Sequence, residues 1–144
     1  MPTPFNDIYS RAIFRFADYE FLKHDIPTRE DILWNYLRSA KTEFAPICEK
    51  NLDDYNEDLQ EFNIELNDDE IEILALGVAY HWLSFKTLNS RALQNVLNSK
   101  DYSYYSPATL LKEVRALRDT VKKEFQSAMR KYSYNHNSVS DLRP

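Results

Sequence analysis

The side chains best suited to chemistry are five carboxylates near the middle of the chain, Asp53, Asp54, Glu57, Asp58 and Glu61. Two carboxylates can act as general acid and general base when they are held at a set distance in a partly dry pocket. These five are crowded on one polar segment, which favours a solvated acidic face instead. The segment also lacks the glycine and the alternate acidic positions of an EF-hand loop, so we expect no specific calcium site.

His81 and Cys48 belong to the other residue types that bind metals or act in catalysis. No second histidine or cysteine lies at ligand spacing from His81, which favours a hydrogen-bonded core residue over a metal ligand. Cys48 is the only cysteine. A single cysteine excludes an intramolecular disulfide and a cysteine-rich zinc site and suits a reducing compartment, and a buried small hydrophobe is favoured over a reactive thiol.

A glycine-rich phosphate loop is excluded because the chain has one glycine. Serine, histidine and aspartate are present, but no nucleophile motif surrounds them. We therefore expect no catalytic, metal-binding or cofactor-binding residues and no enzymatic activity.

The net charge of −5 hides an uneven division along the chain. Residues 1–50 carry 7 basic and 8 acidic side chains, residues 51–85 carry 0 and 10, and residues 86–144 carry 11 and 5. Such an asymmetry can orient one subunit against the next or steer a partner, and two solvated faces are the alternative. Direct nucleic-acid binding is disfavoured, because the basic residues are interleaved with apolar ones and the whole chain is acidic.

Length and composition predict one mostly helical domain. A chain of 144 residues can bury a core as a single domain, and one glycine leaves little of the turn chemistry that sheets require. We expect an all-α fold, a small bundle of about four to five helices over residues 1–132 around a central buried helix. Residues 133–144 have no hydrophobic period and predict a flexible C-terminal tail.

The apolar run over residues 73–83 predicts the central helix, buried on every side, with an acidic start that faces water. Asn67 and Glu70 form a variant of the capping box at this start. Gly77 costs about 1 kcal/mol relative to alanine inside a helix, which suggests that a neighbouring helix crosses closely there.

Four further helices are expected around it. The first begins near Asn6 or Asp7, the second follows a cap at Thr28 and ends near Phe44, and a shorter one covers residues 88–97. The last begins at Pro107, and its apolar residues have a spacing close to a coiled-coil seam: Leu110, Val114, Leu117, Val121, Phe125, Ala128 and Tyr132. Residues 53–65 are interpreted as an exposed connection whose carboxylates repel one another with no cation nearby.

No membrane partner is expected. The longest mostly apolar segment is shorter than the roughly 20 residues that span a bilayer. The amino terminus lacks a charged start followed by an apolar run, so no signal peptide is predicted and the protein would be made in the cytoplasm.

Several segments resemble a family of small structural proteins of tailed bacteriophages. They are residues 62–75 (FNIELNDDEIEILA), 81–83 (HWL), 98–108 (NSKDYSYYSPA) and 111–117 (LKEVRAL). Residues 31–40 (DILWNYLRSA), followed by the helix from Asn67, are similar to the helical core of phage head-to-tail connector proteins, called adaptors or head-completion proteins. The similarity spans most of residues 28–132 and rests on packing and turn motifs, which identify a family better than a role within the neck.

The resemblance implies a virion protein of the neck that forms a ring under the portal, continues the DNA channel and supports tail attachment. Its partners would be other copies of itself, the portal protein, a downstream neck or tail protein, and genomic DNA that passes without sequence-specific binding. The alternatives are another neck protein, such as a tail-completion or stopper protein, and a phage-encoded helical regulator that binds a host protein.

Two groups of residues acquire candidate roles from this resemblance. Asp53, Asp54, Glu57, Asp58 and Glu61 would form an acidic channel or interface face that repels DNA phosphates. Tyr102, Tyr104, Tyr105 and Tyr134 would contact another subunit or the portal, since exposed aromatic residues mark interfaces. For the first three tyrosines, packing of their turn onto the core is the favoured alternative.

Overall fold

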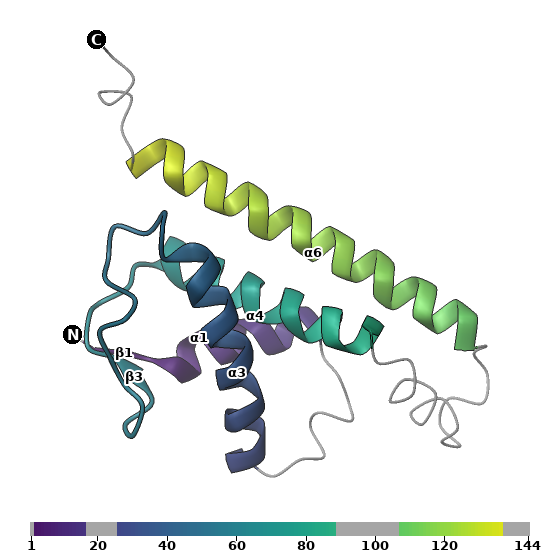
Figure 1. The fold of residues 1–144 in the computed structure, drawn as a ribbon, viewed down its shortest axis with the longest axis horizontal. Coiled ribbons are helices and arrows are strands. Elements are labelled where there is room, and N and C mark those ends of the chain that lie inside the picture. The colour runs from purple at the N-terminus through teal and green to yellow at the C-terminus, as the bar shows by residue number, and fades with distance from the viewer. Residues whose placement is uncertain (1, 17–25, 89–106, 137–144) are drawn as a thin grey trace.

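The computed structural model describes residues 2–16, 26–88 and 107–136. These ranges are mostly helical and contain α1 (Phe5–Phe16), α3 (Ile26–Phe44), α4 (Asp68–Leu88) and α6 (Pro107–His136) (Figure 1). They also contain a small antiparallel sheet of β1 (Thr3–Pro4), β2 (Tyr55–Asn56) and β3 (Glu61–Phe62), in the order β1-β3-β2. The expected helix over residues 88–97 lies outside the described residues except for Leu88, which ends α4.

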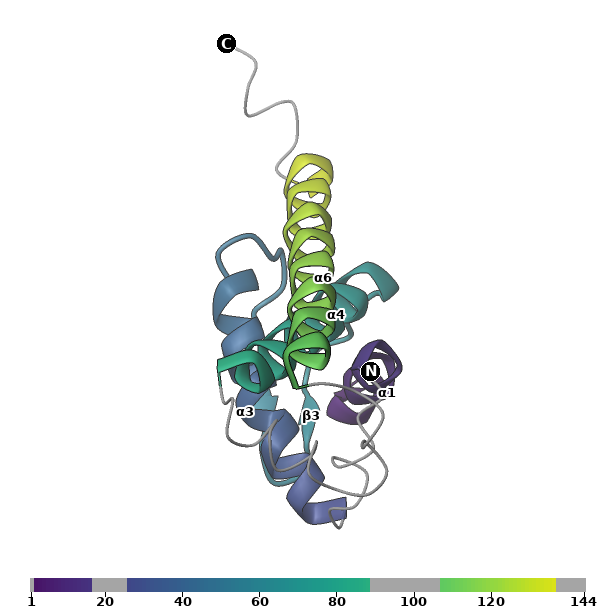
Figure 2. The same ribbon diagram turned by 90° about the vertical axis from the view of Figure 1, so that its right-hand side faces the viewer.

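Helix α4 is the centre of the described fold, because it packs against α1, α3 and α6. The long α6 crosses over it, as Figures 1 and 2 show from two directions. Between Ile73 and Ala79 every residue of α4 is buried, and Trp82 and Leu83 are no more than 5% exposed. A helix that is apolar on all sides is a buried helix. The prediction of a buried central helix is confirmed over this stretch.

Gly77 allows the helices on two sides of α4 to approach closely. A Cβ atom at this position would lie 2.5 Å from the Cβ of Ala40 in α3 and 3.0 Å from Cζ of Phe125 in α6. The predicted close crossing is confirmed. The lost helix propensity at Gly77 is offset by close contact with two neighbouring helices.

The small sheet corrects the all-α prediction. Within the predicted connection over residues 53–65, residues 53–62 form a hairpin of β2 and β3, and β1 pairs with β3 so that Thr3 lies opposite Phe62. Leu52 and Phe62 are 1% and 0% exposed, so this segment is anchored on the core. The physical reason is that apolar and aromatic side chains lie between the carboxylates of this stretch and need burial.

Three helix boundaries differ from the predicted ones. Helix α1 begins at Phe5, and α3 begins at Ile26 without a cap at Thr28, since Pro27 is tolerated in a first helical turn. Helix α6 continues to His136, so residues 133–136 are helical and do not belong to a flexible tail. The buried side chain of Tyr132, 3% exposed, holds α6 on the core close to this end.

The predicted seam of α6 contacts the core along only part of its length. Val121, Phe125 and Tyr132 are buried, and Val114 and Ala128 are half-buried against the core. Leu117 is 40% exposed. Among the described side chains of α6, the apolar stripe is therefore more open before Val121 than from Val121 onward.

Replacement of Gly77 by alanine should lower the free energy of unfolding. Overpacking costs about 1–3 kcal/mol and the regained helix propensity returns about 1 kcal/mol, so the net loss should be at most about 2 kcal/mol. Urea unfolding of Gly77→Ala, Ala40→Gly and the double variant measures the coupling between the two positions. The double variant should be more stable than the two single effects predict, and strict additivity would contradict the close crossing.

Candidate interaction surface

The five carboxylates singled out in the sequence lie together on one hairpin, residues 53–62, which we call the acidic hairpin. Asp53, Asp54, Glu57 and Asp58 are exposed and Glu61 is half-buried. The strand register places Tyr55 opposite Phe62 and Asn56 opposite Glu61. Gln60 closes the turn with a φ of 52°, the left-handed conformation that glycine more often supplies. The hairpin thus presents a row of negative charge to solvent.

An aromatic cluster fixes the acidic hairpin to the helices. The ring of Phe5 in α1 stacks on Trp34 in α3 with centroids 4.8 Å apart, and it meets Phe62 of β3 edge-on at 5.1 Å. Tyr55 of β2 meets Trp34 edge-on at 5.2 Å. Aromatic pairs of this kind stabilise by about 0.5–1.5 kcal/mol each beyond their buried area. The position of the carboxylates therefore depends on α1 and α3.

Lys41 supplies a positive charge next to the hairpin, contrary to the prediction that no cation lies nearby. Its Nζ lies 2.8 Å from Oδ1 of Asp53 and 4.8 Å from the centroid of the Tyr55 ring. Lys41 is only 9% exposed, so its ammonium group requires these partners. Sequence reasoning missed the pair because Lys41 lies on the preceding helix.

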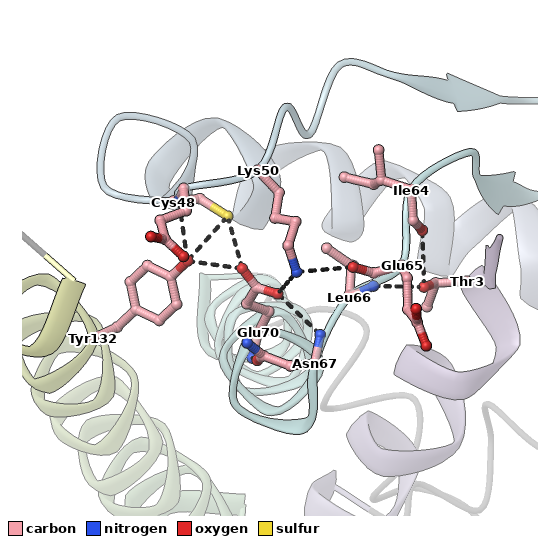
Figure 3. Close-up of polar contacts among 10 residues, drawn as sticks. Thr3, Cys48, Lys50, Ile64, Glu65, Leu66, Asn67, Glu70 and Tyr132 are labelled. Atoms are coloured by element: carbon pink, nitrogen blue, oxygen red, sulfur yellow. Dashed lines mark hydrogen bonds and ion pairs between the residues drawn. The ribbon is translucent and has the colours of Figure 1, made fainter. Parts of the chain in front are cut away.

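Glu70 at the start of α4 is the most buried charged group of the described residues, with 0% exposure (Figure 3). The capping box is confirmed: the Asn67 N–H donates to Glu70 Oε1 at 2.9 Å, and the Glu70 N–H donates to Asn67 Oδ1 at 2.9 Å. The prediction that the whole acidic start faces water is wrong for Glu70, although Asp68 and Asp69 are exposed. We call Glu70 and its partners the Glu70 junction.

The partners of Glu70 come from three parts of the chain (Figure 3). Lys50 Nζ donates to Oε1 at 2.8 Å, and the Tyr132 hydroxyl of α6 donates to Oε2 at 2.7 Å. The Tyr132 oxygen in turn accepts the backbone N–H of Glu49 at 3.0 Å. Both oxygens of the carboxylate are therefore occupied, which is the condition for burying a charge without a large penalty.

The ionisation of this junction suits a structural role. Burial raises the pKa of Glu70, but the hydrogen bonds from Lys50, the Asn67 backbone and Tyr132 outweigh it and the net pKa is lowered. Burial raises the pKa of the Cys48 thiol, whose Sγ lies 3.6 Å from Glu70 Oε2, and the pKa of the Tyr132 hydroxyl. The thiol and the phenol thus keep their protons at neutral pH, and the carboxylate stays ionised.

Cys48 and His81 differ in part from their predicted environments. Cys48 is half-buried beside polar groups of the Glu70 junction and is not enclosed by apolar side chains alone. His81 Nε2 lies 2.7 Å from Oε1 of Glu43 in α3, within ion-pair distance but not aligned for a hydrogen bond. His81 therefore sits at the α3–α4 contact. Among the described residues, no group of three or more histidine, cysteine, aspartate or glutamate side chains is placed to hold a metal ion.

Many of the remaining acidic side chains are paired within the chain. Arg11 binds Asp68 at 3.0 Å, and Arg15 of α1 binds both Glu72 of α4 and Glu124 of α6. These pairs are partly exposed and stabilise the fold only weakly. They matter more for the surface charge, because Arg11 and Arg15 neutralise part of the negative charge near α6.

The exposed face of α6 is basic. The helix carries seven lysines and arginines and three acidic residues, of which Asp119 pairs with Arg118 and Glu124 with Arg15. The exposed basic residues without an ion pair among the described residues are Lys112, Arg115, Lys122, Lys123, Arg130 and Lys131. One chain therefore presents an acidic hairpin and a basic helix face.

The candidate contact tyrosines are only partly placed. Tyr134 lies on α6 and is 67% exposed, whereas Tyr102, Tyr104 and Tyr105 lie outside the described residues. Within the described part of the chain, no helix has the length and apolar character needed to cross a membrane. Comparisons of the chain with known protein families, curated proteins and solved structures found no match.

Replacement of Glu70 by glutamine should lower the free energy of unfolding at neutral pH by about 1–3 kcal/mol, because a charged acceptor of several buried donors is lost. Glu65→Gln is the matched control, since Glu65 is exposed and undergoes the same change. Urea unfolding of both variants at pH 7 measures the difference.

The same variants test the pH dependence. Because the folded-state pKa of Glu70 is lowered, its stabilisation is fully present above its unfolded pKa and is lost as the pH falls through the folded value. Below about pH 5, the unaltered protein should therefore lose stability more steeply than Glu70→Gln. Parallel pH curves for the two proteins would contradict an ionised Glu70.

Proposed function

We propose that this chain is a structural virion protein of a tailed bacteriophage, a head-to-tail connector (adaptor) whose copies form a ring under the portal. The ring would continue the DNA channel and support tail attachment. The resemblance over residues 28–132 supports the family. The observation that carries the self-assembly is the presence of two exposed surfaces of opposite charge, the acidic hairpin and the basic face of α6, on one chain.

A contact between two different surfaces of identical subunits is heterologous, and repeated contacts of this kind close into a ring when the rotation allows it. The acidic hairpin, residues 53–62, carries five acidic side chains and no basic one. On α6, Glu124 pairs with Arg15 of α1, and Asp119 pairs with Arg118 of the same helix. The charges of α6 that remain exposed are therefore mainly positive. Electrostatic complementarity therefore favours the hairpin of one copy against α6 of the next.

A binding role also agrees with how the described titratable groups are used. Four of the five carboxylates of the hairpin are exposed to water and do not enclose a dry site. The buried groups of the Glu70 junction are engaged with one another, and burial keeps the thiol and the phenol protonated. These features support an assembly protein that performs no reaction.

Within the proposed ring, any hairpin carboxylates that face the channel would repel DNA phosphates and let the duplex slide without sequence-specific contacts. The portal protein and a downstream neck or tail protein would bind the two ends of the ring. Tyr134 is an exposed aromatic residue near the C-terminal end of α6 and suits such a contact.

Charge reversal tests the subunit contact. Glu57→Lys/Asp58→Lys and Lys122→Glu/Lys123→Glu should each weaken self-association, because each variant places like charges at the contact. An equal mixture of the two variants should assemble again, since each then offers the complement of the other. Light scattering at low and high salt measures the mass, and salt should weaken the assembly.

Glu65→Lys is the control for this experiment, because Glu65 is an exposed carboxylate outside the acidic hairpin. It should leave the assembled mass unchanged. If the mixture stays as small as its two components while the unaltered protein assembles, the ring does not use these two surfaces.

The position in the particle is tested by electron microscopy of the virion neck. Density for this chain is expected as a ring directly beneath the portal, and a tagged copy of the chain should be recovered in purified particles. A protein that stays monomeric at high concentration and is absent from intact virions would contradict the proposed function.

A further inference from the structure

One leucine of the acidic hairpin is exposed to solvent in a turn that is fixed in place. Leu59 is 66% exposed. Its backbone N–H donates to Asn56 Oδ1 at 3.1 Å, and the N–H of Gln60 donates to the carbonyl oxygen of Glu57 at 3.3 Å. A single exposed leucine is ordinary on a protein surface. Leu59 differs because the turn holds it in a defined position directly after two carboxylates, Glu57 and Asp58.

The same turn is anchored to two helices. The Nε2 of Gln60 donates to Glu30 Oε2 of α3 at 3.1 Å, and the carbonyl oxygen of Gln60 accepts the N–H of Phe5 of α1 at 2.9 Å. The backbone of a turn that is held in this way loses little conformational entropy on binding. Burial of the exposed leucine by a partner would therefore be favourable.

An open groove lies between α1, α4 and α6, and we call it the α6 groove. Its volume is about 500 Å³. The apolar residues that line it are Leu76 of α4 and Ala128 of α6, and the lysines that line it are Lys123 and Lys131 of α6. Both lysines are exposed and have no ion pair among the described residues.

The two carboxylates of the α6 groove are already paired. Arg15 lies 2.8 Å from Glu124 and also forms an ion pair with Glu72, and all three residues line the groove. The lining charges that remain for a partner are those of Lys123 and Lys131. An apolar floor beside two free cations complements an apolar side chain that follows two carboxylates.

We infer that Leu59 of one copy inserts into the α6 groove of a neighbouring copy, against Leu76 and Ala128. The two carboxylates that precede Leu59 would then lie beside the lysines of the groove. This inference rests on the proposed function and deepens it, because it names the side chain and the groove through which the acidic hairpin meets α6. Each copy contributes the leucine to one contact and the groove to the next.

A chain does not fill its own α6 groove. The residues that line the groove come from α1, α4 and α6, and Leu59 of the same chain is exposed. Figure 1 shows the hairpin of β2 and β3 at the lower left and α6 along the upper side. The contact therefore requires two copies and joins two different surfaces, as a heterologous assembly does.

Other pairings are less favourable. A second open hollow, on α3, has a volume of about 410 Å³ and is lined by Asn35, Arg38, Ser39 and Thr42. None of these side chains is apolar, so a leucine would gain little from burial there. A free small molecule suits the α6 groove less well than a protein surface, because small-molecule pockets enclose most of their ligand and this groove is open.

Disulfide trapping tests the contact in the full chain. Cys48→Ser serves as the common background, because serine keeps a hydrogen-bond donor where the thiol lies 3.6 Å from Glu70 Oε2. Leu59→Cys chains and Ser127→Cys chains, mixed in equal amounts under mild oxidation, should form a mixed disulfide, since Ser127 lines the groove. Mass spectrometry of the linked peptides identifies it.

Ser39→Cys is the matched control for the trapping experiment. Ser39 lines the hollow on α3, is exposed and undergoes the same change. Mixed with Leu59→Cys chains, it should give several-fold less mixed disulfide than Ser127→Cys. Equal yields for the two positions would overturn the inference.

Truncation of the leucine gives an independent measurement. Leu59→Ala should weaken self-association by roughly tenfold, because less apolar area is buried in the groove. Its melting temperature should stay unchanged, since the side chain is largely exposed in the free chain. Leu117→Ala makes the same change at an exposed leucine of α6 that does not line the groove, and it should leave self-association unchanged. Light scattering over a dilution series compares the variants, and an equal effect of the two would overturn the inference.

Failure of this contact and failure of the ring are distinguishable. A disulfide between positions 59 and 127 in a protein that forms only short open chains would support the inference and contradict the ring. An assembled ring that does not yield this disulfide would support the ring and overturn the inference.

Discussion

The fold depends on a negative charge that has no access to water. Glu70 is fully buried at the start of α4, where it accepts hydrogen bonds from Lys50, the Asn67 backbone and Tyr132. Loss of any one donor would leave a buried lone pair unsatisfied, which costs more than the bond itself contributes. Because of this cost, the hydrogen bonds from Tyr132 of α6 and from Lys50, in the segment after α3, fix both parts of the chain to the first turn of α4. Helix α6 is thereby held at its C-terminal end by a polar contact and at Phe125 by close packing around Gly77.

The parts of this fold that were predictable are the local ones. The capping box follows from Asn67 and Glu70 three positions apart, and the close helix crossing follows from a glycine that a helix would otherwise avoid. The burial of Glu70 could not be predicted, because its neighbours Asp68 and Asp69 are equally acidic yet exposed. Only its position in the cap distinguishes it, since the third residue of the helix turns its side chain back toward the preceding segment.

The candidate surface was predictable in composition but not in form. The crowding of carboxylates over residues 53–61 indicated an exposed acidic face. The two strands could not be predicted, because each has only two residues and an alternation of apolar and polar residues needs a longer segment. The hairpin turn carried no glycine either, because Gln60 adopts the left-handed conformation there. The ion pair of Lys41 with Asp53 and the hydrogen bond from Gln60 to Glu30 join residues that are well separated in the sequence. Such contacts depend on tertiary packing and have no local signal.

The chain separates its charges into two groups with different consequences. The carboxylates of Glu70, Glu72 and Glu124 are satisfied within the chain by Lys50 and Arg15, and they hold helices together. The carboxylates of the acidic hairpin and many cations of α6 have few such partners among the described residues. Unpaired like charges on one surface repel one another. Contact between the acidic hairpin of one copy and the basic face of α6 of another would relieve this repulsion on both surfaces. Phe5, Trp34 and Phe62 make this arrangement rigid, because they join the hairpin to the same helices that the buried charge organises. In the proposed assembly, a partner would therefore meet an acidic surface that is already positioned, and binding would not require the hairpin to order first.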